Sequence, residues 1–272
     1  MSTIRLVALD IDGTLLPPGA KPDALPDEAL STSVRALVES GVHVVLASGR
    51  MFPGTARIGR HLGLTTPLVC QQGAAVHRLD GTLLYRFHLD PDVAHTLVDY
   101  ATQYDWPYAW FDAVRYVASR HNQPSVDYGY YCGVEPEFRA DARDCGLIPT
   151  GVDVISTRER ATQVHRELEA LLGERVHLLD FPTVTAAHSP EASKGKALAL
   201  LAAGLGVRQD EVMAIGDSVN DVSMLEWAGH GVTLPHCDHY ARKAADEMLK
   251  GDGVSGVTEL LRSLAGKQSR SK

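Results

Sequence analysis

The stretch Leu6-Val7-Ala8-Leu9-Asp10-Ile11-Asp12-Gly13-Thr14-Leu15 decides the fold. Its first four residues form an apolar run that ends abruptly at Asp10, as a buried strand of a parallel sheet does. Two more apolar runs end in the same way, Val42–Ala47 before Ser48-Gly49-Arg50 and Val212–Ile215 before Gly216-Asp217-Ser218. These three runs predict neighbouring strands whose carboxyl ends carry small and polar residues.

Helical segments lie between the predicted strands. Leu25–Ser40 opens with Pro26-Asp27-Glu28 and is closed by Gly41, and Lys194–Ala203 ends at Gly204 just before the third strand. Alternating strands and helices favour an α/β fold, in which a Rossmann-like parallel sheet has helices on both faces.

The middle of the chain, from about Phe87 to Thr185, has a different pattern. Its predicted elements are helices at Pro91–Tyr104 and Arg158–Leu172 and strands at Pro107–Asp112, Arg115–Ser119, Val152–Ser156, Val176–Leu179 and Thr183–Ala187. This order repeats helix–strand–strand, which indicates an α+β unit with an antiparallel sheet. Because the parallel pattern resumes afterwards, we interpret the chain as a core (1–86), an inserted cap (87–187) and the rest of the core (188–272). We predict a disordered tail from Lys267 to Lys272.

Composition excludes several classes of function. The chain has 272 residues, 44% hydrophobic and 22% charged, with a net charge of −8 and no basic stripe, so we expect neither nucleic acid nor a membrane as a partner. Its cysteines are scattered without a CxxC pair, which favours reduced thiols over a zinc site. With no signal peptide and no apolar run of membrane-spanning length, the sequence predicts a cytoplasmic protein.

Asp10 and Asp12 follow the first predicted strand. Residues two apart on a strand point the same way, and ligands of open α/β sheets bind beyond the carboxyl ends of the strands. Such a pair could supply the nucleophile and the proton shuttle of a phosphoryl transfer. Two solvated carboxylates that cap a turn are the alternative interpretation.

Three further segments carry polar groups at matching places. Ser48-Gly49-Arg50 could bind phosphate with a hydroxyl and main-chain N–H groups, although it is also a common strand–helix turn. Lys194 opens a helix ahead of the third strand, where an isolated lysine is usually a solvated surface residue. The segment Gly216–Asp221 offers two carboxylates and an amide, which suit Mg²⁺ or the N-cap of a helix.

Together, these four segments resemble the four motifs of the haloacid dehalogenase superfamily. The sequence is most similar to its Cof-type sugar-phosphate phosphatases, which have a large cap between the second and third motifs. The resemblance runs from the first strand to about Leu261 and is weaker in the cap. The motifs stand here as Asp10-Ile11-Asp12-Gly13-Thr14-Leu15, Ser48-Gly49-Arg50, Lys194-Gly195 and Gly216-Asp217-Ser218-Val219-Asn220-Asp221.

The resemblance implies a role for each motif residue. Asp10 would be the nucleophile and Asp12 the general acid and base. Phosphate would be bound by the main chain of Ile11 and Asp12 and by the residues Ser48, Gly49, Lys194 and Asn220. Mg²⁺ would be bound by Asp10, the main-chain carbonyl of Asp12, and Asp217. Asp221 would support the metal site or orient Lys194, and Arg50 would have a supporting role.

Two segments depart from the family pattern. Gln72-Gly73-Ala74 stands where the family has Asn-Gly-Ala, and Leu234-Pro235-His236 stands where it has Gly-Asn-Ala. In the cap, we expect most aromatic residues to pack against a sheet, and a structural role for His188 is the simpler interpretation, although it could touch a substrate.

We therefore expect a Mg²⁺-dependent phosphatase that hydrolyses a small phosphorylated metabolite, such as a sugar phosphate, through an aspartyl-phosphate on Asp10. Two alternatives stay open at this point: a phosphomutase of the same superfamily, and a non-catalytic phospho-receiver. The sequence does not specify the substrate or the oligomeric state.

Overall fold

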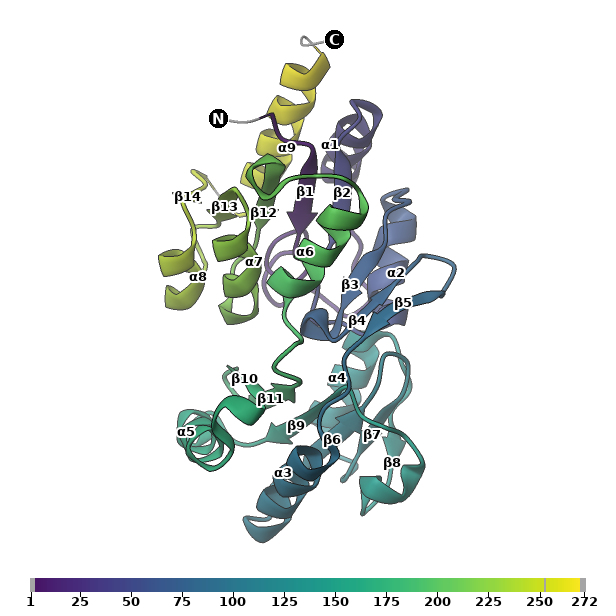
Figure 1. The fold of residues 1–272 in the computed structure, drawn as a ribbon, viewed down its shortest axis with the longest axis vertical. Helices are drawn as coiled ribbons and strands as arrows, with labels where there is room; N and C mark the ends of the chain where they lie inside the picture. Colours follow the sequence, from purple (N-terminus) through teal and green to yellow (C-terminus); the bar gives the residue numbers. More distant parts are fainter. Residues whose placement is uncertain (1–2, 252, 270–272) are drawn as a thin grey trace.

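The computed structural model describes residues 3–251 and 253–269, which form a core and a cap joined by two connections (Figure 1). The core is built on a five-stranded parallel sheet with the strand order β14-β13-β12-β1-β2. Its strands are β1 (Leu6–Leu9), β2 (His43–Leu46), β12 (Val212–Ile215), β13 (His230–Thr233) and β14 (Glu247–Met248). The α/β fold with an inserted α+β cap is as the sequence predicts.

Helices cover both faces of the core sheet because its strands are apolar on both sides. Leu9 and Leu46 face one hydrophobic cluster, while their neighbours Ala8 and Val45 face another. The first cluster lies under α1 (Glu28–Glu39), α2 (Phe52–His61) and α9 (Val254–Ser269), and the second under α6 (Lys194–Gly204), α7 (Val222–Trp227) and α8 (His239–Ala244). In Figure 1, α6 and α7 lie in front of the sheet and α1 and α9 behind it.

A small antiparallel sheet extends the core toward the cap. It consists of β3 (Leu68–Cys70), β4 (Ala75–His77) and β5 (Leu83–Arg86). A single parallel bridge between Ala47 and Val69 places β3 beside the end of β2.

The cap contains a six-stranded sheet in the order β10-β11-β9-β6-β7-β8. Its strands are β6 (Tyr108–Phe111), β7 (Tyr116–Ala118), β8 (Glu137–Phe138), β9 (Gly151–Ile155), β10 (His177–Asp180) and β11 (Val184–His188), and its helices are α3 (Pro91–Gln103), α4 (Gln123–Cys132) and α5 (Ala161–Leu172). Trp110 and Val152 on one face pack beneath α3 and α5. The opposite face carries Ala109 and Phe111 and forms a cluster with Met51 of the core. The cap sheet therefore has an outer helical layer and an inner face turned to the core.

The structure corrects several predictions about the elements. The cap sheet is mixed, because β8 pairs with β7 in parallel after the chain has passed through α4, a helix that the sequence pattern missed. Helix α1 begins at Glu28, three residues later than expected, because the Asp27 side chain accepts a hydrogen bond from Leu30 N and caps it. The tail is not disordered throughout: Lys267–Ser269 belong to α9, while 270–272 lie outside the described residues.

The domain boundaries at 86/87 and 187/188 remain a proposal. The first falls directly after β5, and the second falls one residue before the end of β11. All four cysteines are free thiols. Within residues 3–251 and 253–269, no helix is long and apolar enough to cross a membrane.

Candidate active site

The carboxyl end of β1 brings Asp10 into a buried position between β2 and β12. Asp10 N donates to Ile215 O at 3.0 Å, which continues the pairing with β12, and the residue is only 4% exposed. Three residues later, Gly13 has a φ of +95°, and a Cβ there would lie 2.2 Å from Asp217 Oδ2. Glycine is required at that turn because it allows the Asp217 carboxylate to lie against the main chain.

Lys194 lies between two carboxylates at the start of α6. Its Nζ is 2.6 Å from Asp10 Oδ1 and 2.6 Å from Asp221 Oδ1, and its side chain is completely buried. Burial alone would lower the pKa of Lys194, but these two carboxylates raise it above the usual value for lysine. The alternative of a solvated surface lysine is therefore wrong.

Both carboxylate oxygens of Asp221 are already engaged. Oδ1 accepts from Lys194, and Oδ2 accepts from Asp217 N at 2.9 Å and from Ser218 N at 3.0 Å. Asp221 thus holds Lys194 and fixes the turn that carries Asp217. This geometry supports the orienting role for Asp221 over direct metal ligation.

Crowded negative charge is the main electrostatic feature of the site. One oxygen from each of Asp10, Asp217 and Asp221 lies within 4.8 Å of the others, and all three residues are buried. Burial, together with the charge of Asp221, raises the pKa of Asp217 to about 7. The same two causes raise the pKa of Asp10 well above its usual range, although Lys194 opposes them. Lys194 does not compensate these charges fully.

The donor set fits a hard divalent cation. Mg²⁺ binds carboxylate oxygens and needs few protein ligands because it keeps several waters. With Asp221 engaged elsewhere, Asp10 and Asp217 are the carboxylates that would hold the ion. Thr14 Oγ1 donates to Asp217 Oδ1 at 3.0 Å and orients it as a supporting partner would. Ligation by the Asp12 carbonyl remains a prediction.

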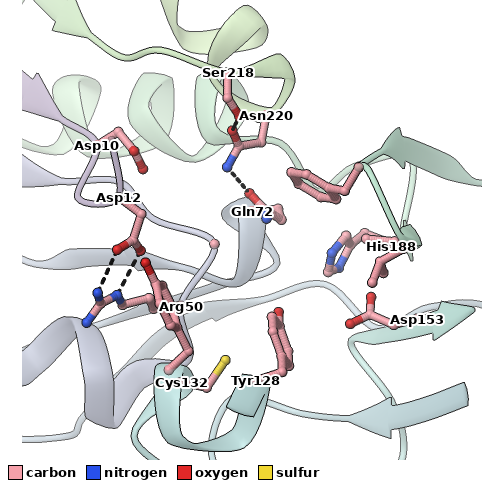
Figure 2. Close-up of a pocket in the computed structure, with 15 residues that line it drawn as sticks. Asp10, Asp12, Arg50, Gln72, Tyr128, Cys132, Asp153, His188, Ser218 and Asn220 are labelled. Atoms are coloured by element: carbon pink, nitrogen blue, oxygen red, sulfur yellow. Dashed lines mark hydrogen bonds and ion pairs between the residues drawn. The ribbon is translucent and has the colours of Figure 1, made fainter. Parts of the chain in front are cut away.

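The Asp12 side chain is turned away from this cluster and toward Arg50. Arg50 Nε donates to Asp12 Oδ2 at 2.8 Å and Nη2 donates to Oδ1 at 2.6 Å, as Figure 2 shows. The guanidinium carbon of Arg50 also lies 4.6 Å from the ring centre of Tyr131, on cap helix α4. Arg50 therefore links Asp12 to the cap, a contact that sequence reasoning did not anticipate.

Gln72 enters the site, although we had noted it only as a departure from the family pattern. Its Oε1 accepts from Asn220 Nδ2 at 2.9 Å, and Ser218 Oγ donates to Asn220 Oδ1 at 2.7 Å, so the Asn220 amide is held in one orientation. A Cβ on Gly49 would lie 2.3 Å from Gln72 Nε2. Glycine at position 49 thus makes room for Gln72. The other segment that differs from the family pattern also lies near the site. His236 Nε2 lies 2.7 Å from Gly13 O, in the turn that follows Asp12.

The second motif adopts the geometry of a strand–helix turn. Ser48 is buried, and its Oγ accepts from Arg50 N at 3.1 Å. The side chain of Ile11 is buried in the core, so only its main chain is available for the predicted contact with phosphate. The structure brings every predicted site residue to one edge of the core sheet, and their assigned roles remain proposals.

A cavity of about 300 Å³ lies between this edge and the inner face of the cap. In Figure 2, Asp10, Asp12 and Gln72 lie on one side, and Tyr128, Asp153 and His188 lie on the other. Sequence reasoning left Asp153 out and counted Tyr128 among the cap aromatics, most of which we expected to pack against a sheet. The simpler interpretation of His188 gave it no contact with the site. Only the position of these residues on the inner cap face, which no local pattern specifies, reveals that they line the cavity.

Comparisons with known proteins agree with this geometry. The family model of haloacid dehalogenase-like hydrolases matches residues 7–261. The phosphatase YwpJ of Bacillus subtilis is 25% identical over 288 residues, which cover 96% of this chain and 100% of that protein. The HMP-PP phosphatase of an Enterobacter species is 29% identical over 239 residues, covering 85% and 84%.

Solved structures share the fold. A haloacid dehalogenase-like hydrolase from Bacillus subtilis has a TM-score of 0.83 at 22% identity, with 95% of this chain and 99% of that chain covered. A HAD/COF-like hydrolase from Plasmodium vivax also has a TM-score of 0.83, at 17% identity and with 99% and 97% covered. The predicted resemblance, including the inserted cap, is confirmed. Because the family model spans nearly all of its length, the chain belongs to the haloacid dehalogenase-like hydrolases.

Proposed function

We propose that this hydrolase is a Mg²⁺-dependent phosphatase that cleaves a small phosphate monoester through an aspartyl-phosphate on Asp10. The observation that carries the proposal is the buried arrangement of Asp10, Lys194 and Asp217. It brings two carboxylates and a buried lysine together at one strand edge, which supports the roles of nucleophile for Asp10, charge-neutralising cation for Lys194 and metal ligand for Asp217. The phosphatase activity named for the curated relatives supports the same reaction class.

Asp10 attacks the phosphorus atom of the bound ester. A bond forms between a carboxylate oxygen and phosphorus while the bond to the alcohol oxygen breaks. Lys194, held at 2.6 Å from Asp10, offsets negative charge on the phosphoryl oxygens. Main-chain groups of the Ser48–Gly49 turn and the amide of Asn220 bind those oxygens, and Mg²⁺ held by Asp10 and Asp217 would neutralise the remaining charge.

Asp12 gives its proton to the departing alcohol and then removes a proton from the water that attacks the phosphoenzyme. That water oxygen bonds to phosphorus, the bond to Asp10 breaks, and phosphate leaves with the Asp10 carboxylate restored. Arg50 donates to both carboxylate oxygens of Asp12, so Asp12 must leave Arg50 before it can give a proton to the departing alcohol. Substrate phosphate competing for Arg50 would release it.

The substitution Asp10→Asn tests the covalent route. An amide cannot attack phosphorus, so we expect folded Asp10→Asn protein to lose all measurable release of phosphate from p-nitrophenyl phosphate. Circular dichroism confirms folding, and wild-type enzyme freed of metal and reloaded with Mg²⁺ is the positive control. Near-wild-type turnover by the folded variant would rule out the covalent mechanism through Asp10. Isomerisation of glucose 1-phosphate without net phosphate release by the wild type would instead support the phosphomutase.

A further inference from the structure

Among the described residues, Asp153 is the only carboxylate that the cap contributes to the lining of the cavity between core and cap. It lies in the middle of β9, where it is paired with Ala186 of β11 and Ala109 of β6. The side chain points to the inner face, opposite to Val152 and Val154, which pack under the outer helices. Small neighbours on both sides leave the Asp153 carboxylate facing the space above the core (Figure 2).

The Asp153 carboxyl is buried, and one of its two oxygens has no hydrogen-bond partner among the described residues. The residue is 3% exposed, and the oxygen in question is Oδ1. Burial raises the pKa of Asp153 to about 8, and no cationic side chain in the described ranges opposes that effect. An uncompensated buried carboxyl destabilises a fold unless something else supplies hydrogen bonds or charge. Its position in the cavity wall indicates that a ligand does so.

A second acceptor lies on the neighbouring strand. His188 Nδ1 is 3.1 Å from Thr150 O, so Nδ1 carries the hydrogen and Nε2 is left as an acceptor. Burial lowers the pKa of His188 to about 4, which keeps the ring neutral. The ring lines the same cavity as Asp153. The cap thus offers a carboxylate and a neutral imidazole, both suited to accept hydrogen bonds.

The rest of the cap wall is aromatic and apolar. Tyr128, Phe181 and Val184 of the cap line the cavity. The cavity lining includes one cationic side chain, Arg50, which is bound to Asp12. Aromatic rings and a buried carboxyl together favour a ligand cation, because an ammonium would displace the proton of Asp153 and pair with the resulting carboxylate, whereas a hydroxyl would add only a neutral hydrogen bond.

We propose that Asp153 and His188 form a subsite that binds an ammonium group on the alcohol part of the substrate. This inference rests on the proposed phosphatase function and narrows its substrate class to phosphate monoesters of amino alcohols, including amino sugars. The ammonium donates hydrogen bonds to Asp153 and to His188 Nε2, while the phosphate end lies against Asp10. Asp153 touches the alcohol part and takes no part in the transfer.

A series of alkyl phosphates tests the subsite. The compounds carry two to six carbons and end in a methyl, a hydroxyl or an ammonium group, so that only the far end changes. At the best chain length, we expect wild-type kcat/KM for the ammonium compound to exceed that for the methyl compound by about tenfold or more. Equal values for the ammonium and methyl compounds, or for the ammonium and hydroxyl compounds, at every length would overturn the proposal.

Asp153→Asn keeps the shape of the residue and removes its charge. We expect the ammonium-to-methyl ratio of kcat/KM to fall by about tenfold, and Asp153→Leu, a second variant with the same branching but no polar side-chain atom, to lower it at least as far. Thr185→Val is the matched control, because Thr185 is also buried with an unpartnered hydroxyl but pairs with Val154, on the other face of the sheet. An unchanged ratio in folded Asp153→Asn protein would overturn the assignment.

Binding measurements separate this inference from the phosphatase proposal. Calorimetric titration of the Asp10→Asn variant with the same compounds needs no turnover. The wild type could release no phosphate while the Asp10→Asn variant bound the ammonium compounds about tenfold more tightly than the methyl compounds. In that case the phosphatase proposal would fail and the subsite would stand. If the wild type released phosphate but neither protein preferred the ammonium compounds, the phosphatase proposal would stand and the subsite would fail.

Discussion

Lys194 carries a positive charge on a side chain that is completely buried. Such a charge is tolerated only when it is paired, and here two carboxylates at 2.6 Å provide the pairing. Asp221 is in turn fixed by main-chain N–H groups, so Lys194 is held in place before substrate arrives. This preorganisation is what makes a cation effective in catalysis, because little rearrangement is needed during the reaction.

Lys194→Ala should therefore lower kcat/KM on p-nitrophenyl phosphate by on the order of a hundredfold or more. Lys196→Ala is the matched control: Lys196 lies two residues along the same helix, is half exposed and contacts Pro190 O and Glu191 at the surface. Its loss should cost little. Folding of both variants is checked by circular dichroism. Equal losses in the two folded variants would contradict the assignment of Lys194.

Asp153 should make stability depend on pH. Its pKa of about 8 in the folded chain lies above the value of about 4 in an unfolded chain, so between these limits the native state keeps a proton that the unfolded state releases. The contribution of Asp153 to stability is complete below about pH 4 and is lost as the pH rises toward 8.

Urea unfolding of wild type and Asp153→Asn at pH 5, 6.5 and 8 measures this effect. The variant should gain stability relative to wild type as the pH rises, by on the order of a few kcal/mol in total. Titratable neighbours, namely Tyr116, Tyr128 and His188, are present in both proteins and largely cancel in the difference. A difference that stayed constant with pH would show that Asp153 is charged in the folded state throughout.

Sequence reasoning reached the motif residues because their function requires fixed residue types at strand ends. Asp10 and Lys194 were assigned before any geometry was known, and the structure places them in contact. Asp153 was missed because a single aspartate in an apolar strand carries no local signal. Its importance depends on which face of the sheet is turned to the core, and sequence periodicity alone does not specify that.

At the scale of elements, α4 is the part of the cap that the pattern did not predict. The segment Gln123–Cys132 contains glycine, valine and three tyrosines, which are weak helix formers. Asn122 caps its start, since its side chain accepts from Ser125 N, and Gly133 ends it in the left-handed region. Packing against α2 of the core then outweighs weak intrinsic propensity, and no local pattern reports such packing.

Helices α2 and α4 approach so closely that glycine is required between them. A Cβ on Gly54 would lie 2.8 Å from Cys132 O of the cap. Gly54→Ala should favour the helix itself by about 1 kcal/mol but force α4 away, moving Tyr131 off Arg50. We expect kcat/KM on p-nitrophenyl phosphate to fall by about tenfold while the core stays folded.

Gly204→Ala is the control for that substitution. Gly204 is also helical, and a Cβ there would meet nothing within 4 Å. It should keep wild-type activity. If Gly54→Ala behaved in the same way, the contact between the two helices would have no bearing on the site.

At the scale of the whole molecule, a bound metal ion should join parts of the chain that lie far apart in sequence. Asp10 comes from the first sequence segment of the core and Asp217 from the second, yet their carboxylates lie close together. Each carries charge that a cation would compensate. We expect activity to disappear after treatment with EDTA and to return with Mg²⁺, and Ca²⁺ to inhibit because its looser coordination misplaces the nucleophile.

Thermal unfolding provides a readout that does not depend on activity. A ligand that binds only the native state raises its stability, so Mg²⁺ should raise the Tm of wild type, and should raise that of Asp217→Asn much less. Activity retained in full after rigorous chelation, or identical Mg²⁺-induced shifts in the two proteins, would count against this metal site.

The architecture was predictable because hydrophobic patterning reports it directly. Continuous apolar runs such as Leu6–Leu9 predict strands covered on both faces, and the loss of that pattern after Phe87 predicts the insertion. How the cap sits on the core was not predictable. That placement depends on contacts such as Gly54 with Gly133 and Arg50 with Tyr131, which join segments far apart in the chain.

The parallel pairing of β1 with β12 has a consequence for the order of events on the ribosome. Leu6 pairs with Val212, and Lys194 follows Asp10 by 184 positions, so the whole cap is synthesised between the two halves of the core. The cap strands pair over much shorter separations, and such contacts close faster. We expect the cap to fold first on the nascent chain, because the strands that complete the core sheet beside β1 and β2 are synthesised only after the cap. Asp10 is thus synthesised early but has no lysine beside it until most of the chain has been translated.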